Sequence, residues 1–368
     1  MKLISKNLHI IYKYLQILFG FLNTILPKGL KLSPLVLRIR ITNKCNLHCD
    51  FCYLSGSLNI GETNHLTIDE WKKIINNLPR WTIVDITGAE PFLAKDFKEV
   101  LTLLLEKKLK VSLTTNGYHI NEDIIKLMVS KGLFYLMVSI DGSKEYHNKI
   151  RGHQKSFDHI QKFLKTVEKL KRELNSSYPH ICIKSTITDD NMDEIFKLND
   201  QIFNDFDIHS HSLNLMFQNH ARGGIILEQN LESEKFNSGN TFNYKQNSKA
   251  DVKAKLIKFI KKMNELQRPI NIKPPLKITD IGSYIDNPGS FGVASCNRYN
   301  SIQTMYFDGS ITPCDIGYKL ADIRELDYNL ARTWHQSSFK KFKQFFFKNT
   351  PFAPACDACC LADQCVKR

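Results

Sequence analysis

The sequence lacks several features that would assign it to a common class of protein. It has no internal repeat, which excludes a solenoid or a propeller, and it has no helix-turn-helix or RNA-binding signature. No small-residue cleavage site follows its apolar amino-terminal stretch, so a secretory signal peptide is not indicated. Acidic residues are few beside basic ones, 37 against 51, which gives a formal net charge of +14. This excess indicates either an anionic partner or a lysine-rich solvated surface. No feature other than the charge indicates nucleic-acid binding, so we expect no nucleic-acid partner.

The ten cysteines are unevenly distributed along the 368 residues. Six fall in the last 73 residues and three lie within residues 45–52, whereas Cys182 stands alone in an apolar, strand-like run where it fits a buried side chain. Clustered thiols are typical of metal ligands in a reducing compartment, so we expect a cytoplasmic protein. The length predicts two domains with additional segments.

Three cysteines form one compact loop, Cys45-x3-Cys49-x2-Cys52, directly after the apolar residues 35–42. Three thiolates on one tight loop can bind three irons of a cubane iron–sulfur cluster and leave the fourth iron open to a small molecule. A structural zinc site and three unrelated buried thiols are the alternatives. Because zinc ribbons usually pair one Cys-x2-Cys with a second, three cysteines in a single loop fit zinc poorly. The spacing therefore favours a cluster with an open iron.

Residues 8–26 are apolar except for a narrow polar stripe that recurs every three or four residues, which predicts an amphipathic helix ending at Pro27. A wide apolar face flanked by lysines is typical of a helix that lies in a membrane interface. Packing of this helix on the protein's own barrel is the second interpretation. The third is a membrane-spanning helix, in which Lys13, Gln16 and Asn23 would be costly in hydrocarbon.

From residue 35 to residue 217 the pattern alternates between strands and helices. The predicted strands are Val36–Thr42, Thr82–Thr87, Lys110–Thr115, Phe134–Ile140, His180–Ile187 and Ser212–Phe217. The predicted helices are Ile68–Leu78, Asp96–Lys107, Glu122–Lys131, Phe157–Leu174 and Met192–Phe203, the first with a capping box at Thr67–Glu70. Repeated βα units predict an α/β fold with a parallel sheet, here a partial (β/α)6 TIM-like barrel. Functional loops would then lie at the carboxyl ends of the strands, where the three cysteines follow the first one.

Residues 218–250 interrupt this alternation with a polar segment that predicts a loop, a lid or a flexible insert. Residues 252–266 predict a basic amphipathic helix, and three prolines at 269, 274 and 275 separate it from a cysteine-rich section. We therefore divide the chain into an amphipathic helix (1–30), a partial barrel (31–217), a polar insert with a bridging helix (218–290) and a cysteine-rich extension (291–368).

Five motifs, taken in order, resemble those of the radical S-adenosylmethionine (radical SAM) enzymes. In that family the three loop cysteines bind a 4Fe–4S cluster, S-adenosylmethionine chelates the fourth iron, and an aromatic residue, here Phe51, packs near the adenine. Gly88-Ala89-Glu90-Pro91 is similar to the family's Gly-Gly-Glu-Pro, with Ala89 in place of a glycine. A glycine bend exposes backbone carbonyls to an ammonium group, and Glu90 can accept from that group or orient the loop.

The third and fourth motifs follow the next two strands. Thr114-Thr115-Asn116-Gly117 resembles the family's Thr-Asn-Gly, and Ser139-Ile140-Asp141-Gly142 with Arg151-Gly152 resembles a Ser-x-Asp-Gly…Arg-Gly pattern. The resemblance implies that Ser139 and Arg151 meet the carboxylate or ribose of S-adenosylmethionine. Asn-Gly and Asp-Gly are also common turns, so only the set as a whole indicates a cofactor site. Candidate acid/base residues, each of which also fits a structural or solvated role, are Lys184, His211, His220 and Arg222.

The fifth motif lies at the carboxyl-terminal end and resembles the SPASM/twitch extension of the family, which carries one or two auxiliary 4Fe–4S clusters. Its spacings are Gly309-x4-Cys314 and Cys356-x2-Cys359-x5-Cys365. Two clusters would need eight cysteines and six lie here, so the resemblance implies one auxiliary cluster on Cys296, Cys314, Cys356 and Cys359. Cys360 and Cys365 are then spare thiols or alternative ligands. A zinc site on the same four residues is the alternative.

The resemblance implies an enzyme in which reduction of the first cluster cleaves S-adenosylmethionine to a 5′-deoxyadenosyl radical, which takes a hydrogen atom from a substrate. A flavodoxin- or ferredoxin-like electron donor would be a partner. The amphipathic helix and the basic charge favour a membrane-associated substrate, such as a lipid or lipid-linked sugar, met at the cytoplasmic membrane face. A ribosomally made peptide or protein is the second interpretation, and a non-catalytic iron–sulfur protein that transfers electrons or senses redox state is the third.

Overall fold

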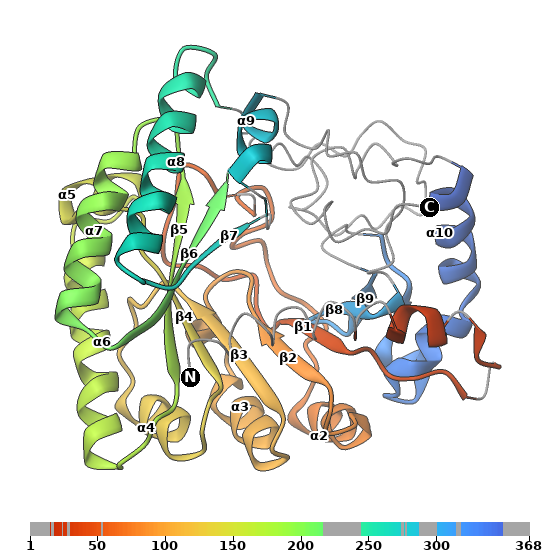
Figure 1. The fold of residues 1–368 in the computed structure, drawn as a ribbon. Helices are drawn as coiled ribbons and strands as arrows, with labels where there is room; N and C mark the ends of the chain where they lie inside the picture. Colours follow the sequence, from red (N-terminus) through yellow and green to blue (C-terminus); the bar gives the residue numbers. More distant parts are fainter. Residues whose placement is uncertain are drawn as a thin grey trace.

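The computed structural model of this chain describes residues 15, 18–23, 25–27, 30–52, 54–215, 244–273, 276, 278–286, 300–313 and 318–348. Its centre is one ten-stranded sheet (Figure 1) with the order β10-β9-β8-β1-β2-β3-β4-β5-β6-β7. Neighbouring strands from β8 through β1 to β7 are parallel, whereas β9 and β10 are antiparallel to their neighbours. The strands are β1 (Val36–Arg40), β2 (Ile83–Ile86), β3 (Lys110–Thr115), β4 (Tyr135–Ser139), β5 (His180–Ile187), β6 (Ile208–Leu215), β7 (Ile270–Lys273), β8 (Ile302–Tyr306), β9 (Ser310–Thr312) and β10 (Ala321–Asp322).

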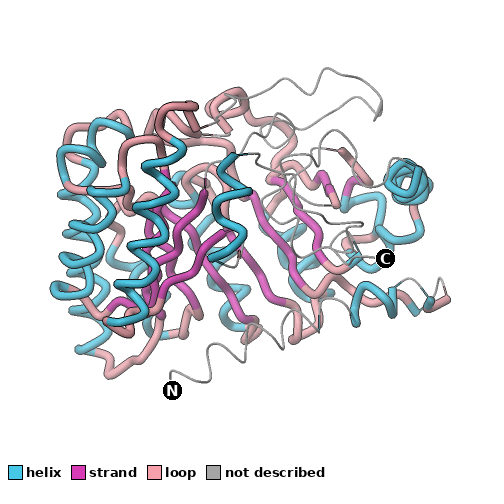
Figure 2. The backbone as a smooth tube through the Cα atoms, turned by 45° about the horizontal axis from the view of Figure 1, so that its top comes forward, coloured by secondary structure: helices cyan, strands magenta, loops and turns pink. Residues whose placement is uncertain are grey.

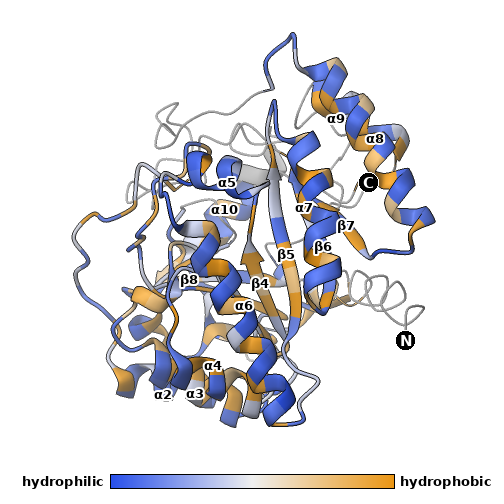
Figure 3. Cartoon of the chain, turned by 90° about the vertical axis from the view of Figure 1, so that its left-hand side faces the viewer, coloured by the Kyte–Doolittle hydropathy of each residue, from blue (hydrophilic) through white to orange (hydrophobic). Residues whose placement is uncertain are grey.

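Helices cover the outer face of this sheet (Figure 2). They are α2 (Ile68–Asn77), α3 (Phe97–Glu106), α4 (Glu122–Ser130), α5 (Lys144–Ile150), α6 (Ser156–Glu173), α7 (Met192–Asp205), α8 (Lys249–Glu265), α9 (Ile278–Asp286) and α10 (Ser337–Lys348), with short 3-10 turns at η2 (Pro91–Leu93), η4 (Ile323–Leu326) and η5 (Leu330–His335). Both hydrophobic and hydrophilic residues alternate along α6, α7 and α8 (Figure 3), as amphipathic helices require.

The two faces of the sheet differ in chemistry because successive side chains of a strand point in opposite directions. Leu37 and Ile39 of β1 are fully buried in the main apolar core. Arg38, between them, points the other way and pairs with Asp85 of β2 at 3.2 Å. Ser112 of β3 donates to the same carboxylate at 2.9 Å. The helix-covered face is therefore an ordinary hydrophobic core, and the inner face of the barrel is polar.

The predicted fold class and its six βα units are confirmed, with the capping box at Thr67 and Glu70 present. β6 begins at Ile208, earlier than predicted, because the polar residues His209–Ser212 do not show an apolar run. α5, β7, α9 and the strands β8 to β10 were not predicted from the sequence. β7 and β8 extend the parallel sheet on its two sides, so the described barrel exceeds six strands. The division into four segments remains a prediction.

The amino-terminal helix packs partly on the protein itself. Residues 18–23 are helical, and the Phe19 ring lies 4.8 Å from that of Trp81, edge to face. Asn23 is buried and donates to the carbonyl of Asn300 at 3.0 Å. Phe21 and Ile25, in contrast, are 59% and 58% exposed. One face of this helix is thus held by the barrel edge, and the other carries exposed apolar side chains. Among the described residues, no helix combines the length and apolarity that a membrane span needs.

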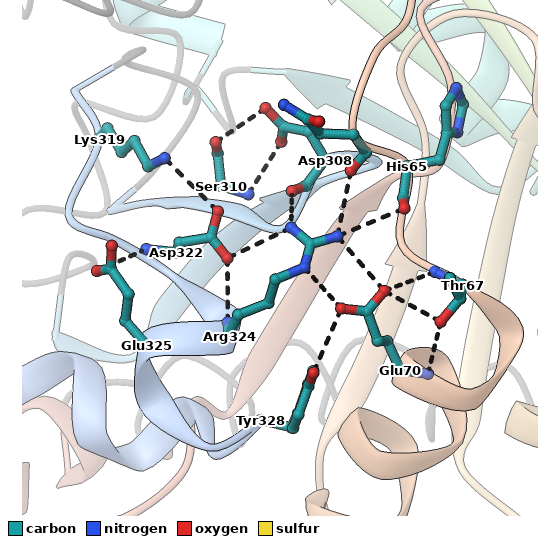
Figure 4. Close-up of polar contacts among 11 residues, drawn as sticks. His65, Thr67, Glu70, Asp308, Ser310, Lys319, Asp322, Arg324, Glu325 and Tyr328 are labelled. Carbon is teal, nitrogen blue, oxygen red and sulfur yellow. Dashed lines mark hydrogen bonds and ion pairs between the residues drawn. The ribbon is translucent and has the colours of Figure 1, made fainter.

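Arg324 of η4 joins the carboxyl-terminal strands to the barrel (Figure 4). Its guanidinium contacts Glu70 of α2 at 2.6 Å and donates to the Asp308 carbonyl, in the β8–β9 turn, at 2.8 Å. It also donates to the carbonyls of Asn64 and His65, which precede α2. Burial acts to raise the pKa of Glu70, but bonds from Arg324 and Thr67 outweigh it and lower this pKa to about 2. The carboxylate is therefore ionised at neutral pH.

Several predicted features fall outside the described residues: most of the polar segment 218–250, the candidate residues His220 and Arg222, and the carboxyl-terminal cysteines Cys296, Cys314, Cys356, Cys359, Cys360 and Cys365. The helix predicted at 252–266 corresponds to α8, which begins three residues earlier and ends one residue earlier.

Candidate active site

The three-cysteine loop follows β1 at the carboxyl end of the parallel strands. Asn59, which adopts a left-handed conformation with φ of 58°, holds the first cysteine: its side chain accepts from the Cys45 N–H at 2.9 Å and donates to the Cys45 carbonyl at 3.1 Å. Glu62, nearly buried, accepts from the hydroxyl of Thr42 at 2.6 Å and from the N–H of Asn43 at 2.5 Å. These side-chain bonds fix the start of the loop where no regular structure exists.

The loop's thiols lie near one another. Burial raises the pKa of Cys45 to about 11, and the charges of Cys49 and Cys52 add to this rise. Within the described part of the chain, no group of three or more His, Cys, Asp or Glu is arranged around one metal ion. In a cubane cluster each cysteine binds a different iron, so its ligands need not converge on one point. Three half-buried neighbouring thiols therefore fit a 4Fe–4S cluster.

Gly88 and Arg40 meet beside the loop. Gly88 has φ of +122°, and a Cβ built there would lie 3.2 Å from Cγ of Arg40. This backbone conformation and close approach both require glycine. The Arg40 guanidinium lies 5.2 Å from the ring centroid of Tyr306, and its charge acts to lower the pKa of Cys52, which burial raises. A cation thus lies close to the third cysteine, where it favours an anionic cluster.

Glu90 is fully buried and binds the chain rather than facing open space. It accepts from the Thr115 hydroxyl at 2.8 Å, from the Asn116 N–H at 2.8 Å and from the Phe92 N–H at 3.2 Å. Burial raises the pKa of Glu90 to about 7 in spite of these bonds. Asn116 in turn donates from its side chain to Asn46 of the cysteine loop at 2.8 Å. Glu90 therefore ties the ends of β2 and β3 to the loop. Ala89 and Pro91 flank it, and Pro91 begins η2.

Arg151 contacts the middle of the cysteine loop. Its Nε donates to Asp141 Oδ2 at 2.5 Å, its Nη1 lies 3.6 Å from Cys49 Sγ, and its guanidinium carbon lies 5.1 Å from the Phe51 ring centroid. Asp141 is fully buried and also accepts from the Thr186 N–H at 2.8 Å. Burial raises the pKa of Cys49, and the Arg151 charge acts in the opposite direction.

The backbone around Arg151 is bonded to the same loop. The carbonyls of Ile150 and Arg151 accept from Asp50 and His48 at 3.1 and 3.3 Å. Gly152, with φ of +66°, passes so close that a Cβ there would lie 3.0 Å from the His48 carbonyl oxygen. The end of α5 is thus docked on the cysteine loop through both side-chain and main-chain contacts.

Two other candidate residues, Ser139 and His211, and the buried His147 have different surroundings. Ser139 is the last residue of β4, on the polar inner face, and pairs with Lys184 of β5. His147 is buried and accepts from the Asp141 N–H at 3.2 Å; burial holds its pKa well below the usual range, so it is neutral. His211 lies between Ser185 and Asn199 on the helix-covered side, at 2.7 and 3.0 Å. Burial lowers the pKa of His211 to about 3. His211 is therefore a structural residue and not an acid or base of the barrel interior.

Four residues that support the loop were missed by the sequence analysis: Asn46, Asn59, Glu62 and Asp141 as the partner of Arg151. Asn46 and Asn59 are polar residues in a loop, and nothing in their local pattern marks them. Asp141 lay within a recognised motif, and its distance of ten residues from Arg151 gave the only available signal.

Comparison with known families identifies residues 39–198 as a match to the radical SAM superfamily. The chain is 28% identical over 173 residues to the sporulation killing factor maturation protein SkfB of Bacillus subtilis (strain 168), covering 46% of this chain and 40% of that protein. It is 33% identical over 120 residues to the Fe-coproporphyrin III synthase of Methanosarcina barkeri (strain Fusaro / DSM 804), covering 32% of this chain and 30% of that protein. The chain thus spans less than half the length of these relatives.

Among solved structures, the fold is similar to that of Streptococcus suis SuiB bound to its precursor peptide SuiA, with a TM-score of 0.63 at 17% identity over 90% of this chain and 72% of that chain. It is also similar to anSMEcpe with bound AdoMet, with a TM-score of 0.59 at 19% identity over 88% of each chain. At these identities the likeness concerns the fold. The matched domain spans β1 to α7 and includes the three-cysteine loop, the Gly88–Pro91 bend and the Arg151 docking segment. Residues 39–198 of this chain are therefore a radical SAM domain.

Proposed function

We propose that this chain is a radical SAM enzyme that modifies a ribosomally made peptide. The observation that carries the proposal is the convergence of Cys45, Cys49 and Cys52 with three supporting strand ends at the mouth of a polar barrel. Glu90 links two of those ends to the loop, and Arg151 links the third. A half-buried, polar and pre-ordered site of this kind suits a cofactor that must be shielded from water.

The described residues divide the work of holding the cofactors. Cys45, Cys49 and Cys52 would hold a 4Fe–4S cluster, and the Gly88–Pro91 bend, Thr115, Asn116, Ser139, Arg151 and Phe51 would surround S-adenosylmethionine. When bound, these cofactors supply a radical that removes a hydrogen atom from a substrate. Arg40 and Arg151 contribute positive charge near the anionic cluster. The Glu90 carboxyl group orients the bend through three accepted bonds and keeps one further acceptor position for an ammonium group of the cofactor.

The substrate class follows from the relatives. SkfB is a maturation protein, and SuiB has been solved with a precursor peptide. The expectation of a lipid or lipid-linked sugar has no such support, and part of the helix that suggested it packs on the barrel through Phe19. We therefore favour the peptide. A peripheral contact with the cytoplasmic membrane face through the exposed side chains of the amino-terminal helix stays a separate proposal.

Two further components belong to the proposal. The carboxyl-terminal cysteines Cys296, Cys314, Cys356 and Cys359, with Cys365 as an alternative ligand, would hold an auxiliary 4Fe–4S cluster. A flavodoxin- or ferredoxin-like protein would supply electrons. Both need a reducing compartment, which we propose to be the cytoplasm.

The first test is formation of 5′-deoxyadenosine by the anaerobically reconstituted chain with dithionite and S-adenosylmethionine. We expect product from the wild type and from Cys182→Ala, whose thiol lies elsewhere, and none from Cys45→Ala, Cys49→Ala or Cys52→Ala. Wild-type protein with full iron content and no product would support an electron-transfer or redox-sensing protein instead. Iron analysis gives about eight irons per chain with an auxiliary cluster and about four if the tail holds zinc.

The second test addresses the substrate. Short peptides encoded beside the gene of this chain are incubated with the reduced enzyme and analysed by mass spectrometry for a change in mass. A modified peptide supports the proposal. Turnover only with lipid vesicles or lipid-linked sugars would contradict it and indicate a membrane-associated substrate.

A further inference from the structure

Arg151 is held in one position by three different contacts. Its Nε is bonded to Asp141, its Nη1 approaches Cys49 Sγ, and its guanidinium lies near the ring of Phe51. The residue is 8% exposed. A buried guanidinium restrained by an ion pair and a ring keeps its direction, because each alternative rotamer would lose the paired carboxylate.

The distance from Arg151 to Cys49 is also held through the backbone. The carbonyls of Ile150 and Arg151 accept from N–H groups of Asp50 and His48, which flank Cys49. Asp141 is fixed independently, since its other oxygen accepts from Thr186 of β5 and its carbonyl accepts from Asn191. The donor, its counter-ion and the cysteine are therefore anchored to one another by bonds that do not involve any cofactor.

A hydrogen bond to a cluster sulfur and a nearby positive charge both stabilise the more negative, reduced state of an iron–sulfur cluster. We propose that Arg151 raises the reduction potential of the cluster on Cys45, Cys49 and Cys52 by donating to Cys49 Sγ, and that Asp141 holds the guanidinium and partly offsets its charge. This inference rests on the proposed function for the identity of the cluster. The step is a one-electron reduction by an external flavodoxin- or ferredoxin-like donor, and no covalent bond forms or breaks in it.

The two residues have opposite expected effects. Arg151→Gln removes the charge closest to the sulfur, so the reduced cluster loses stabilisation and the midpoint potential becomes more negative. Asp141→Asn leaves the guanidinium but removes its counter-charge, so the potential becomes more positive. If Arg151 and Asp141 had only a structural role, both substitutions would loosen the docking of α5 on the loop and would shift the midpoint potential in the same direction.

The test is a redox titration of the reconstituted holoprotein followed by electron paramagnetic resonance, without S-adenosylmethionine. The signal of any auxiliary cluster is obtained from Cys45→Ala and subtracted. We expect Arg151→Gln to change the reduction equilibrium about tenfold, which is about 59 mV for one electron, in the negative direction. We expect Asp141→Asn to shift it positively. Equal midpoints for wild type and both variants, or shifts of the same sign, would overturn the inference.

Controls keep the result interpretable. If Arg151→Gln does not retain iron, Arg151→Lys replaces it: the charge remains but the planar fork is lost, so a negative shift is still expected and an unchanged midpoint contradicts the proposal. Iron content and circular dichroism establish that each variant is folded and loaded. Since the titration needs no turnover, the expected shifts in a protein that forms no 5′-deoxyadenosine would support the Arg151 role and reject only the enzymatic proposal.

Discussion

Replacement of Arg324 tests how the carboxyl-terminal strands are attached to the barrel. The substitution Arg324→Met keeps most of the apolar stem and removes every donor. It breaks the contacts with both Glu70 oxygens, at 2.6 and 3.4 Å, and three bonds to backbone carbonyls. Glu70 is then left with the bonds from Thr67 and Tyr328. An anion that is only 14% exposed thereby loses its cation.

The magnitude follows from the exposure of the two partners. Hydrogen bonds to charged groups contribute about 1.5–3 kcal/mol, and the 33% exposure of Arg324 places this pair toward the lower end because water screens it. The carbonyls near the surface regain water. We therefore expect Arg324→Met to reduce the free energy of unfolding by about 1.5–2 kcal/mol and Glu70→Gln by about 1–2 kcal/mol. The double variant should show a coupling of about 1–2 kcal/mol.

Urea unfolding followed by circular dichroism measures these changes. Arg332→Met is the matched control: Arg332 pairs with Asp327, but both side chains are more than half exposed, so a change within about 0.5 kcal/mol is expected. Because the pKa of Glu70 is lowered from 4.5 to about 2, the stabilisation is complete above about pH 4.5 and is lost as the pH falls toward 2. Arg324→Met should lack this loss. Equal effects of Arg324→Met and Arg332→Met, or no coupling with Glu70, would refute the reasoning.

Three other substitutions probe the site and the amino-terminal helix. Gly152→Ala places an alanine in a left-handed conformation against the His48 carbonyl, so it should reduce the free energy of unfolding by about 1–2 kcal/mol and lower the iron content. Gly61→Ala is the control, because a Cβ there has no atom within 4 Å, and it should change neither quantity. Equal melting temperatures of the two variants would contradict this prediction. Glu90→Gln presents an amide to three backbone and hydroxyl donors, so we expect a loss of about 1–3 kcal/mol in thermal unfolding, and an unchanged melting curve would show that the carboxyl group does not order the bend. Phe19→Ala removes the contact with Trp81 and should reduce the free energy of unfolding by about 1–2 kcal/mol. Phe21 is exposed, so Phe21→Ala should change the free energy of unfolding by no more than about 0.5 kcal/mol. If this face of the helix binds a membrane, Phe21→Ala should instead weaken flotation with anionic vesicles.

The sequence was sufficient to predict elements whose pattern is local. The capping box before α2, the alternation that sets the six βα units and the cysteine spacing are all contained in short windows. Interactions between distant residues were not predictable in this way. Nothing near residue 324 indicates Glu70 as its partner, and the four-residue β7 and five-residue β8 are too short to stand out after a polar segment. The ten-residue separation of Asp141 and Arg151 becomes meaningful only once α5 turns the chain back onto the cysteine loop.

The place of β1 in the sheet has a consequence for the order in which the protein matures. β1 lies between β2 and β8, and Val36 pairs with both Ile83 and Ile302. During synthesis the strand that leads into the cysteines acquires its first neighbour, β2, early, but its second edge stays open until β8 has been synthesised. Iron delivered before that moment enters a sheet with an open side, whereas iron delivered afterwards meets a closed one. The pairing of β8 with β1 therefore separates two stages at which metal can reach the cysteine loop.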